Sequence, residues 1–427
     1  MKIKTIALSF VAVVSLNATT ITELFDALEK QPLLQIDELN KQMGQIGKKK
    51  VDSNYYPTLN LFGSYTHYNS PTNLLPLDPI TAGKLAQTPG KSVPFAQTIQ
   101  KVGVLVNMPL YVKELGELSQ KMKHLAKSAK YKKMLNLYKS QATILGANSG
   151  LEYLDNLLVT LNSTKKSVQN TQNDIKISVD NGRMPGIALD KIDQKLNELD
   201  ININNINIQR LNLIAKIQKL TNIKLKHSVK MNLDTKLQEN SIFALKPLEE
   251  KLLASKKDLS AVKSKRYSPK VALNVMYSEN YAQEDVKLGK SVHEGYGYYQ
   301  IGISIPLYDK SKNVDIELKK IQLLKDQKNI EKTKDELKAD IQSIKEQLKL
   351  LDRSALLTKE NIKKQKNLLK FAKVAVKEGR MTQEDYLRYE DGLLSANAKY
   401  YQVVSKKWQS IAKLTVIYGN NLKGMIK

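Results

Sequence analysis

The sequence of 427 residues predicts a mainly α protein with a small β part, in which one helix–strand–strand–long helical hairpin unit occurs twice. The first indication is a repeated pattern: Asn107–Tyr111 (NMPLY) returns as Ser304–Tyr308 (SIPLY), and Gly182–Met184 (GRM) returns as Gly379–Met381 at the same offset. The second is that period-2 stretches precede each NMPLY-type segment and heptad-spaced stretches follow it. A long internal repeat describes the whole fold, so we expect repeats at residues 19–225 and 226–427.

The first 18 residues are typical of a secretory signal peptide. Lys2 and Lys4 precede an apolar stretch from Ile6 to Leu16, and small or polar residues follow to Ala18. The stretch is shorter than the roughly 20 residues that a membrane-spanning helix needs. We therefore expect residues 1–18 to be removed on export and exclude them from the fold.

The composition limits the chain's chemistry and its partners. There is no cysteine, and 68 Lys and Arg against 42 Asp and Glu give a net charge of +26. The lysines are spread along helical stretches such as Lys319 to Lys349, which is typical of solvated helix faces, and export argues against nucleic acid as a partner. No later stretch reaches the roughly 18 apolar residues of a membrane-spanning helix, so a membrane crossing would require strands in a closed barrel.

Each repeat begins with a helix and continues with two strands. The helices are expected at about 20–50, where Pro32 interrupts, and after Pro247. Alternating apolar and polar residues then predict strands at about 57–68, 97–108, 269–281 and 297–306. Ten-residue strands have the length that a tilted strand needs to cross a bilayer. Four tyrosines, Tyr65, Tyr277, Tyr281 and Tyr299, are expected at membrane interfaces. A soluble sandwich would also show the alternation.

The segment from Ser70 to Phe95 between the first two strands contains five prolines, and we expect it to be an irregular loop.

Long helical hairpins follow, at about 110–221 and 308–418. In the first, Ile144, Ala147, Leu151, Leu154, Leu158 and Leu161 keep a 3-4 spacing, which predicts coiled-coil packing. There is no proline between Leu110 and Met184, or after Leu307. About 70 helical residues give a rod of roughly 105 Å, which suits a structure that bridges a gap.

Gly182 and Gly379 are expected to end the ascending helices with a positive φ. Pro185 is suited to open the next helix in the first copy, and Thr382, with Asp385 three residues later, to cap it in the second.

Four strands cannot close a barrel, because their edges would leave backbone groups unpaired in lipid. Several copies must therefore share one barrel. Three copies give twelve strands, enough to leave an aqueous lumen, and twelve long helices that continue it as a tube. Apolar strand faces would meet lipid, while Asn60, Asn274, Gln300 and Ser304 would face water. We thus expect a trimeric β-barrel, four strands per protomer, continued by an α-helical coiled-coil tunnel.

At this point the chain resembles the TolC-like outer-membrane efflux protein family over its whole mature length. The resemblance is carried by Pro57 and Pro269 before the strands, by the two Pro-Leu-Tyr segments after them, and by the two glycine turns. It implies a homotrimeric, passive exit duct of a tripartite efflux or type I secretion system in a Gram-negative cell. It also implies docking to a periplasmic adaptor protein and an inner-membrane pump or ABC transporter.

The resemblance also implies roles for residues at the far ends of the hairpins. Adaptor contacts fall on the tip turns, that is on Gly182, Arg183, Met184, Gly379, Arg380, Met381 and Thr382. A gate aspartate falls on Asp385, with Asp190 and Asp193 nearby in the first half. A further acidic residue of some members is replaced by Arg388.

Motifs for catalysis are weak. His67, His124, His227 and His293 have no metal-ligand spacing, and there is no Gly-x-Ser-x-Gly. Gly44–Lys49 has too few residues between its glycines for a phosphate loop, and we interpret it as a helix end with solvated lysines. We expect no enzyme, metal or cofactor. The alternatives are a structural or adhesive coiled-coil protein without a channel, and an exported basic scaffold for an anionic polymer.

Overall fold

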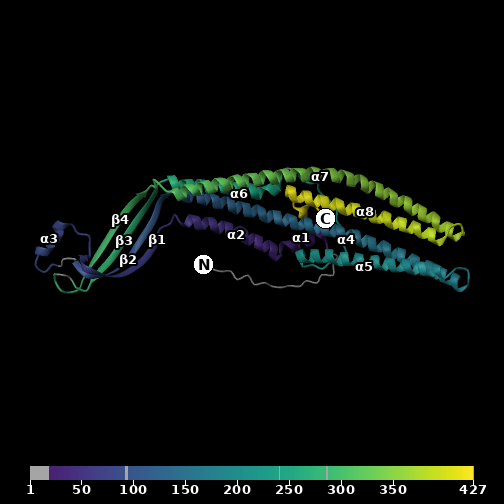
Figure 1. Ribbon diagram of the computed structural model, residues 1–427, viewed down its shortest axis with the longest axis horizontal. Coiled ribbons are helices and arrows are strands. Elements are labelled where there is room, and N and C mark those ends of the chain that lie inside the picture. Colours follow the sequence, from purple (N-terminus) through teal and green to yellow (C-terminus); the bar gives the residue numbers. More distant parts are fainter. Residues whose placement is uncertain (1–18, 92–94, 240, 285–286, 427) are drawn as a thin grey trace. The chain divides into compact units, whose positions relative to one another are not determined.

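The computed structural model describes residues 19–91, 95–239, 241–284 and 287–426, and the expected signal peptide, residues 1–18, lies outside them (Figure 1). The chain forms two compact units: one holds residues up to Glu38, Tyr131–Lys246 and Thr333–Lys427, the other Leu39–Lys130 and Pro247–Lys332. The elements in order are α1 (Ile21–Glu29), α2 (Pro32–Ser53), β1 (Thr58–Asn73), α3 (Pro79–Gln87), β2 (Phe95–Val112), α4 (Lys113–Asp180), α5 (Ile187–Thr221), η1 (Phe243–Leu245), α6 (Lys246–Tyr267), β3 (Lys270–Ala282), β4 (Val292–Ser304), α7 (Lys310–Lys377), α8 (Gln383–Tyr418) and η2 (Leu422–Gly424).

The four expected strands form one antiparallel sheet in the order β1-β2-β3-β4. β1, β2 and β4 are longer than the sequence predicted, with 16, 18 and 13 residues, and β3 has 13 residues, the predicted length. Figure 1 shows the four strands side by side. In the described part of the chain, β1 and β4 each have a single neighbouring strand. Both outer strands therefore present an edge that pairs with no further strand among the described residues.

The strand register gathers apolar side chains on one face of the sheet. One row across the four strands consists of Leu59, Val106, Val275 and Tyr299. The neighbouring row on this face runs from Leu61 through Val104 and Tyr277 to Gly297. Leu59, Leu61 and Tyr299 are largely exposed in the single chain. Period-2 alternation in each strand thus makes these two rows an apolar surface, while towards the loop end the same face also carries Gln100, Glu279 and His293.

The opposite face carries one polar row, formed across the four strands by Thr58, Asn107, Asn274 and Gln300. Asn60 lies on the same face in the next row, whose other members are Leu105, Met276 and Tyr298. The segregation of the expected water-facing residues from the apolar face is therefore confirmed for Asn60, Asn274 and Gln300.

The expectation of an irregular loop at Ser70–Phe95 is wrong in two respects. β1 continues through Pro71 to Asn73, and α3 occupies Pro79–Gln87. Pro79 stands in the first turn of α3, where a missing N–H costs nothing, and the Asp78 carboxylate accepts from Thr81 N at 2.9 Å as the N-cap. A proline count alone does not show which prolines fall at such tolerated positions.

The interpretation of Gly44–Lys49 as a helix end is also wrong, because α2 continues to Ser53 and the segment lies inside it. The helix remains regular there, as both glycines are helical positions packed against α4.

The helical unit is held together by the predicted heptads. Leu154, Leu161 and Val168 of α4 are buried with Ile192, Leu199 and Ile206 of α5. Leu387 and Leu394 of α8 pack against the same cluster. A second cluster joins Ile344 of α7 to Leu414 and Ile417 of α8. The 3-4 spacing therefore predicted the buried stripe correctly.

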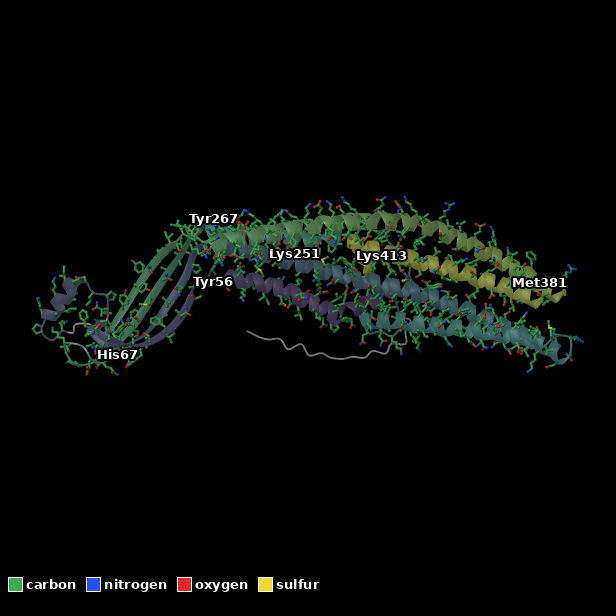
Figure 2. The ribbon with its side chains drawn as sticks, in the orientation of Figure 1. Tyr56, His67, Lys251, Tyr267, Met381 and Lys413 are labelled. Carbon is green, nitrogen blue, oxygen red and sulfur yellow. The ribbon has the colours of Figure 1, made fainter. Side chains whose placement is uncertain are left out.

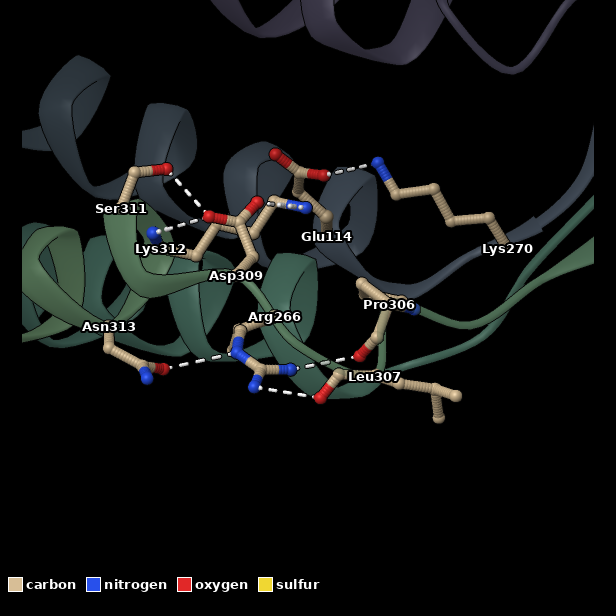
Figure 3. Close-up of polar contacts among 9 residues, drawn as sticks. All are labelled: Glu114, Arg266, Lys270, Pro306, Leu307, Asp309, Ser311, Lys312 and Asn313. Carbon is tan, nitrogen blue, oxygen red and sulfur yellow. Dashed lines mark hydrogen bonds and ion pairs between the residues drawn. The ribbon is translucent and has the colours of Figure 1, made fainter.

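Arg266, at the end of α6, fixes the backbone where β4 gives way to α7 (Figure 3). Its side chain is 8% exposed, and its guanidinium donates to the carbonyls of Pro306 and Leu307 at 2.9 and 3.1 Å and to Asn313 Oδ1 at 3.1 Å. Asp309 then caps α7 by accepting from Lys312 N at 3.2 Å. These bonds satisfy carbonyls that lie outside both the sheet and the helix.

Candidate docking and gating site

The two turns at the ends of the long hairpins have the same backbone geometry. In the first, Arg183 N donates to Ser178 O at 2.8 Å and Gly182 N to Val179 O at 2.9 Å. In the second, Arg380 N donates to Ala375 O at 2.8 Å and Gly379 N to Val376 O at 3.0 Å. Both are Schellman motifs, in which these bonds satisfy the last carbonyls of α4 and α7.

The expected positive φ of the turn glycines is confirmed. Gly182 has φ +69° and Gly379 has φ +67°. A Cβ at either position would meet nothing within 4 Å, so space does not require glycine there. The left-handed backbone conformation does, because it costs an ordinary L-residue roughly 1–2 kcal/mol.

The descending helices begin differently. Thr382 is the N-cap of α8 and accepts from Asp385 N at 3.1 Å, while its hydroxyl donates to Asp385 Oδ2 at 2.7 Å. The predicted cap is therefore confirmed. Pro185 leads into α5 by accepting from Ala188 N at 3.0 Å, but α5 itself begins at Ile187 without a side-chain cap.

The side chains of the turns are presented outward. Arg183 is exposed, and Met184 is 43% exposed. Arg380 is exposed and forms an ion pair of 3.3 Å with Glu378. Met381 is half-buried; Figure 2 labels it at the turn between α7 and α8.

A groove of about 560 Å³ connects the two turns. Its apolar lining includes Met184, Ile187 and Leu387, and its charged lining includes Lys191 and Arg388. Thr382 also lines it. The groove thus brings residues of both tip turns to one surface, although they are far apart in sequence.

Polar pairs fasten the helices beside this groove. Lys195 Nζ of α5 lies 2.9 Å from Asp391 Oδ2 of α8. Within the first hairpin, the Gln172 side chain of α4 donates to Asp193 Oδ1 at 2.5 Å. The expected gate residue Asp193 is therefore half-buried and engaged inside its own hairpin.

The other two expected gate carboxylates lie in different surroundings. Asp190 is exposed in the first turn of α5. Asp385 is half-exposed at the start of α8, beside the Arg388 guanidinium at 3.7 Å. The three aspartates therefore do not form one cluster within the chain.

Glu390 is a polar residue of this region that the sequence did not single out. Its carboxylate lies on α8, where the Tyr386 hydroxyl donates to Oε1 at 3.0 Å. Burial raises the pKa of Glu390, and the neighbouring Asp391 adds to the rise, while Ser167, Tyr386 and Lys373 oppose it. A carboxyl group inside a heptad stripe, one turn after a tyrosine, was the signal that could have revealed it.

All four tyrosines expected at a membrane interface lie on the apolar face of the sheet. Tyr65 and Tyr281 share one row near the loop end, joined through Gln100, and Tyr281 stacks on His293 with 5.8 Å between ring centroids. Tyr277 and Tyr299 lie in inner rows of the same face.

No group of three or more His, Asp or Glu side chains in the described residues is arranged to hold a metal ion. None of their helices is both long and apolar enough to cross a membrane.

Comparison with known proteins identifies the fold. No family model and no curated protein matches the sequence. The structure matches that of CusC, a protein described as forming a transmembrane channel, with a TM-score of 0.75 and 12% identity over 96% of each chain. It matches the Campylobacter jejuni CmeC outer membrane channel with a TM-score of 0.74 and 14% identity, over 95% of this chain and 85% of that one. The Neisseria gonorrhoeae MtrE outer membrane channel matches with a TM-score of 0.72 and 15% identity, over 93% of this chain and 88% of that one.

The chain therefore has the fold of TolC-like outer-membrane channels. The resemblance seen in the sequence is confirmed at the level of the fold: a mainly helical chain with one four-stranded antiparallel sheet.

Proposed function

We propose that the protein is the outer-membrane exit duct of a tripartite efflux or type I secretion system. It would act as a passive homotrimeric channel that opens when a periplasmic adaptor and an inner-membrane pump or ABC transporter dock. The barrel would lie in the outer membrane and the helical part in the periplasm, and the duct would perform no catalysis.

The observation that carries this proposal is the four-stranded sheet with two open edges and one apolar face. An apolar face of this extent suits lipid, and lipid does not tolerate unpaired backbone edges. Pairing β1 of one copy with β4 of the next removes every edge, and three copies give a twelve-stranded barrel with room for water. The row containing Asn107, Asn274 and Gln300 would then line the lumen.

The hairpins supply the second support. α4 and α7 have 68 residues each, and α5 and α8 have 35 and 36, as expected for two repeats of one unit. Both tip turns also have the same pattern of backbone hydrogen bonds, which supports an internal duplication. We assign adaptor docking to these turns and to the groove between them. We assign the periplasmic gate to Asp385, with Asp190 and Asp193 as further gate residues.

Single-channel conductance in planar bilayers tests the duct. Purified trimers are expected to conduct little at rest, and Asp385→Asn is expected to raise the conductance, because it removes a charge from the narrowed mouth while keeping the side chain's size. Thr382 would still accept from the backbone N–H of residue 385, so α8 keeps its cap. Trimers that bind detergent but never conduct, with or without this substitution, would exclude a duct.

Adaptor docking is tested separately with Arg380→Glu, which should weaken adaptor crosslinking and efflux while the trimer stays intact. Lys366→Glu makes the same charge change at an exposed site on α7 and serves as the matched control. If both variants show equal crosslinking and equal efflux, the tip turns are not part of the docking surface.

A further inference from the structure

A groove between α2 and α4, within the unit that holds the sheet, collects lysine side chains. It has a volume of about 590 Å³, and its lining includes Lys41, Lys48, Lys49, Lys123, Lys127 and Lys130. We call it the lysine groove. Three of these lysines belong to each helix, and no carboxylate is among the described residues that line it.

The Gly44–Lys49 segment explains why the two helices approach closely enough to form this groove. A Cβ at Gly44 would lie 3.0 Å from the Cα of Ala126, and one at Gly47 would lie 2.4 Å from Cε of Met122. Glycine at Gly44 lets the two helix backbones come together, whereas at Gly47 the flexible end of the Met122 side chain could move aside. The lysines that flank the contact on each helix are thereby brought to the same surface, which a larger residue at Gly44 would prevent.

Two carboxylates outside the lining pair with lysines of the groove. Asp52 Oδ2 lies 2.5 Å from Lys48 Nζ, and Asp52 Oδ1 accepts from Ser119 at 2.5 Å. Glu250 Oε2 contacts His124 at 2.7 Å, and its other oxygen lies 4.0 Å from Lys127. These contacts offset the charge of Lys48 and part of that of Lys127. Lys49, Lys123 and Lys130 are exposed and add positive charge to the same groove.

Repulsion among these lysines lowers the stability of the folded state modestly, and a bound anion would offset it. Lys123 and Lys127 are four residues apart on α4, and Lys127 and Lys130 are three apart, spacings at which like charges repel by roughly 0.2–0.5 kcal/mol per pair. Lysines from α2 add to this across the groove. If these lysines were only solvated residues on helix faces, there would be no reason for lysines of two helices to line the same groove.

We propose that the lysine groove is a binding site for a phosphate-bearing anion. A phosphate group carries up to two negative charges and several acceptor oxygens, so it accepts from several ammonium groups at once. The groove volume falls in the range of small-ligand sites, roughly 300–1,000 Å³, and admits one headgroup-sized anion. This site is separate from the tip turns and does not depend on channel opening.

Two sources supply this chemistry: an anionic phospholipid headgroup or a soluble phosphorylated compound. α2 ends at Ser53 and β1 begins at Thr58, so Lys48 and Lys49 lie within about 8 Å of the end of α2 that leads into the sheet. If the sheet is in the outer membrane, this end of the groove lies near headgroups. The other end, at Lys41 and Lys130, is open to a soluble anion.

The test is calorimetric titration of the full mature protein in neutral detergent with sodium pyrophosphate. The triple variant Lys49→Gln, Lys123→Gln, Lys130→Gln removes charges while leaving the Lys48–Asp52 and Lys127–Glu250 contacts in place. We expect its affinity to fall at least tenfold. The control triple, Lys320→Gln, Lys334→Gln, Lys338→Gln on α7, removes the same charge from exposed positions outside the groove and should bind like the wild type.

A second arm distinguishes the two sources. The titration is repeated in nanodiscs of phosphatidylglycerol and of phosphatidylcholine. If pyrophosphate binds the wild type and the control triple more weakly in phosphatidylglycerol discs than in phosphatidylcholine discs, lipid headgroups occupy the groove. If it binds equally in both discs, the natural ligand is a soluble anion. Absence of pyrophosphate binding in detergent, or equal binding by the two triple variants, overturns the proposal.

Discussion

Lys195 and Asp391 form an ion pair of 2.9 Å that joins α5 of the first hairpin to α8 of the second. Both side chains are partly exposed, with 31% and 42% of their surface accessible, so the pair contributes at most roughly 1 kcal/mol to stability. Its importance lies in its position, because it lines the groove between the tip turns and holds the second hairpin against the first.

The first prediction follows from this pair. If the hairpins separate when the proposed channel opens, Asp391→Lys and Lys195→Asp should each raise the open probability, because each places like charges side by side. The double exchange should return it to the wild-type value. Planar-bilayer recordings provide the measurement. Single variants and the double exchange with the same open probability would show that the pair does not restrain the hairpins.

The second prediction concerns Gly379. Gly379→Ala should destabilise the Schellman turn by about 1 kcal/mol, because alanine must adopt φ near +67°. Gly379→Asn should cost less, since asparagine tolerates this conformation better. Hydrogen exchange of the Gly379 and Arg380 amides gives the readout, with a roughly five- to tenfold acceleration in the alanine variant. Equal exchange in all three proteins contradicts the role given to φ.

The third prediction concerns Arg266. Arg266→Met should lower the free energy of unfolding by about 3 kcal/mol, because it leaves the carbonyls of Pro306 and Leu307 without their donors. Arg266→Lys should lose less, since an ammonium keeps the charge but lacks the planar fork that reaches both carbonyls. Thermal unfolding followed by circular dichroism measures both. Arg353→Met, on the long α7 helix, is the control, and an equal melting temperature for it and Arg266→Met would refute the argument.

The fourth prediction is a pH dependence set by Glu390. Its folded-state pKa is raised, so the folded protein holds a proton that the unfolded chain has already released. Stability from this group therefore falls as the pH rises from the ordinary glutamate pKa through the raised value. Glu390→Gln removes the loss and should raise the melting temperature by about 2 °C at pH 8, with no gain at pH 4.

The same titration on Glu378→Gln provides the control, because that carboxylate is largely exposed in the second tip turn. A gain at pH 8 that persists unchanged at pH 4 would mean that packing, rather than ionisation, explains the effect of Glu390→Gln.

Local patterns predicted much of the fold. Alternation placed Val104, Val275 and Tyr299 on one side of their strands, and the register unites these sides into a single face. The glycines at 182 and 379 marked both tip turns because few other residues adopt a positive φ. These features depend on neighbours within a few residues, which is the information that periodicity contains.

Features that depend on distant partners were not predictable in this way. The hydrogen bond that Gln172, on the neighbouring helix, donates to Asp193 is one such feature. Arg266 reaches carbonyls 40 and 41 residues away, and Gly44 meets Ala126 across two helices. A heptad pattern shows which side of a helix is buried, but it does not identify the helix that covers it.

α4 and α7 have the same length, 68 residues each, so both ascending helices end at a tip turn after the same number of turns. Each added residue would advance a turn by about 1.5 Å, so lengthening one hairpin alone would stagger Gly182 against Gly379 and divide the groove between them. Only matched insertions of whole heptads in all four long helices would extend the reach without breaking the seam. Length changes within this fold should therefore come in steps of seven residues, taken in both halves together.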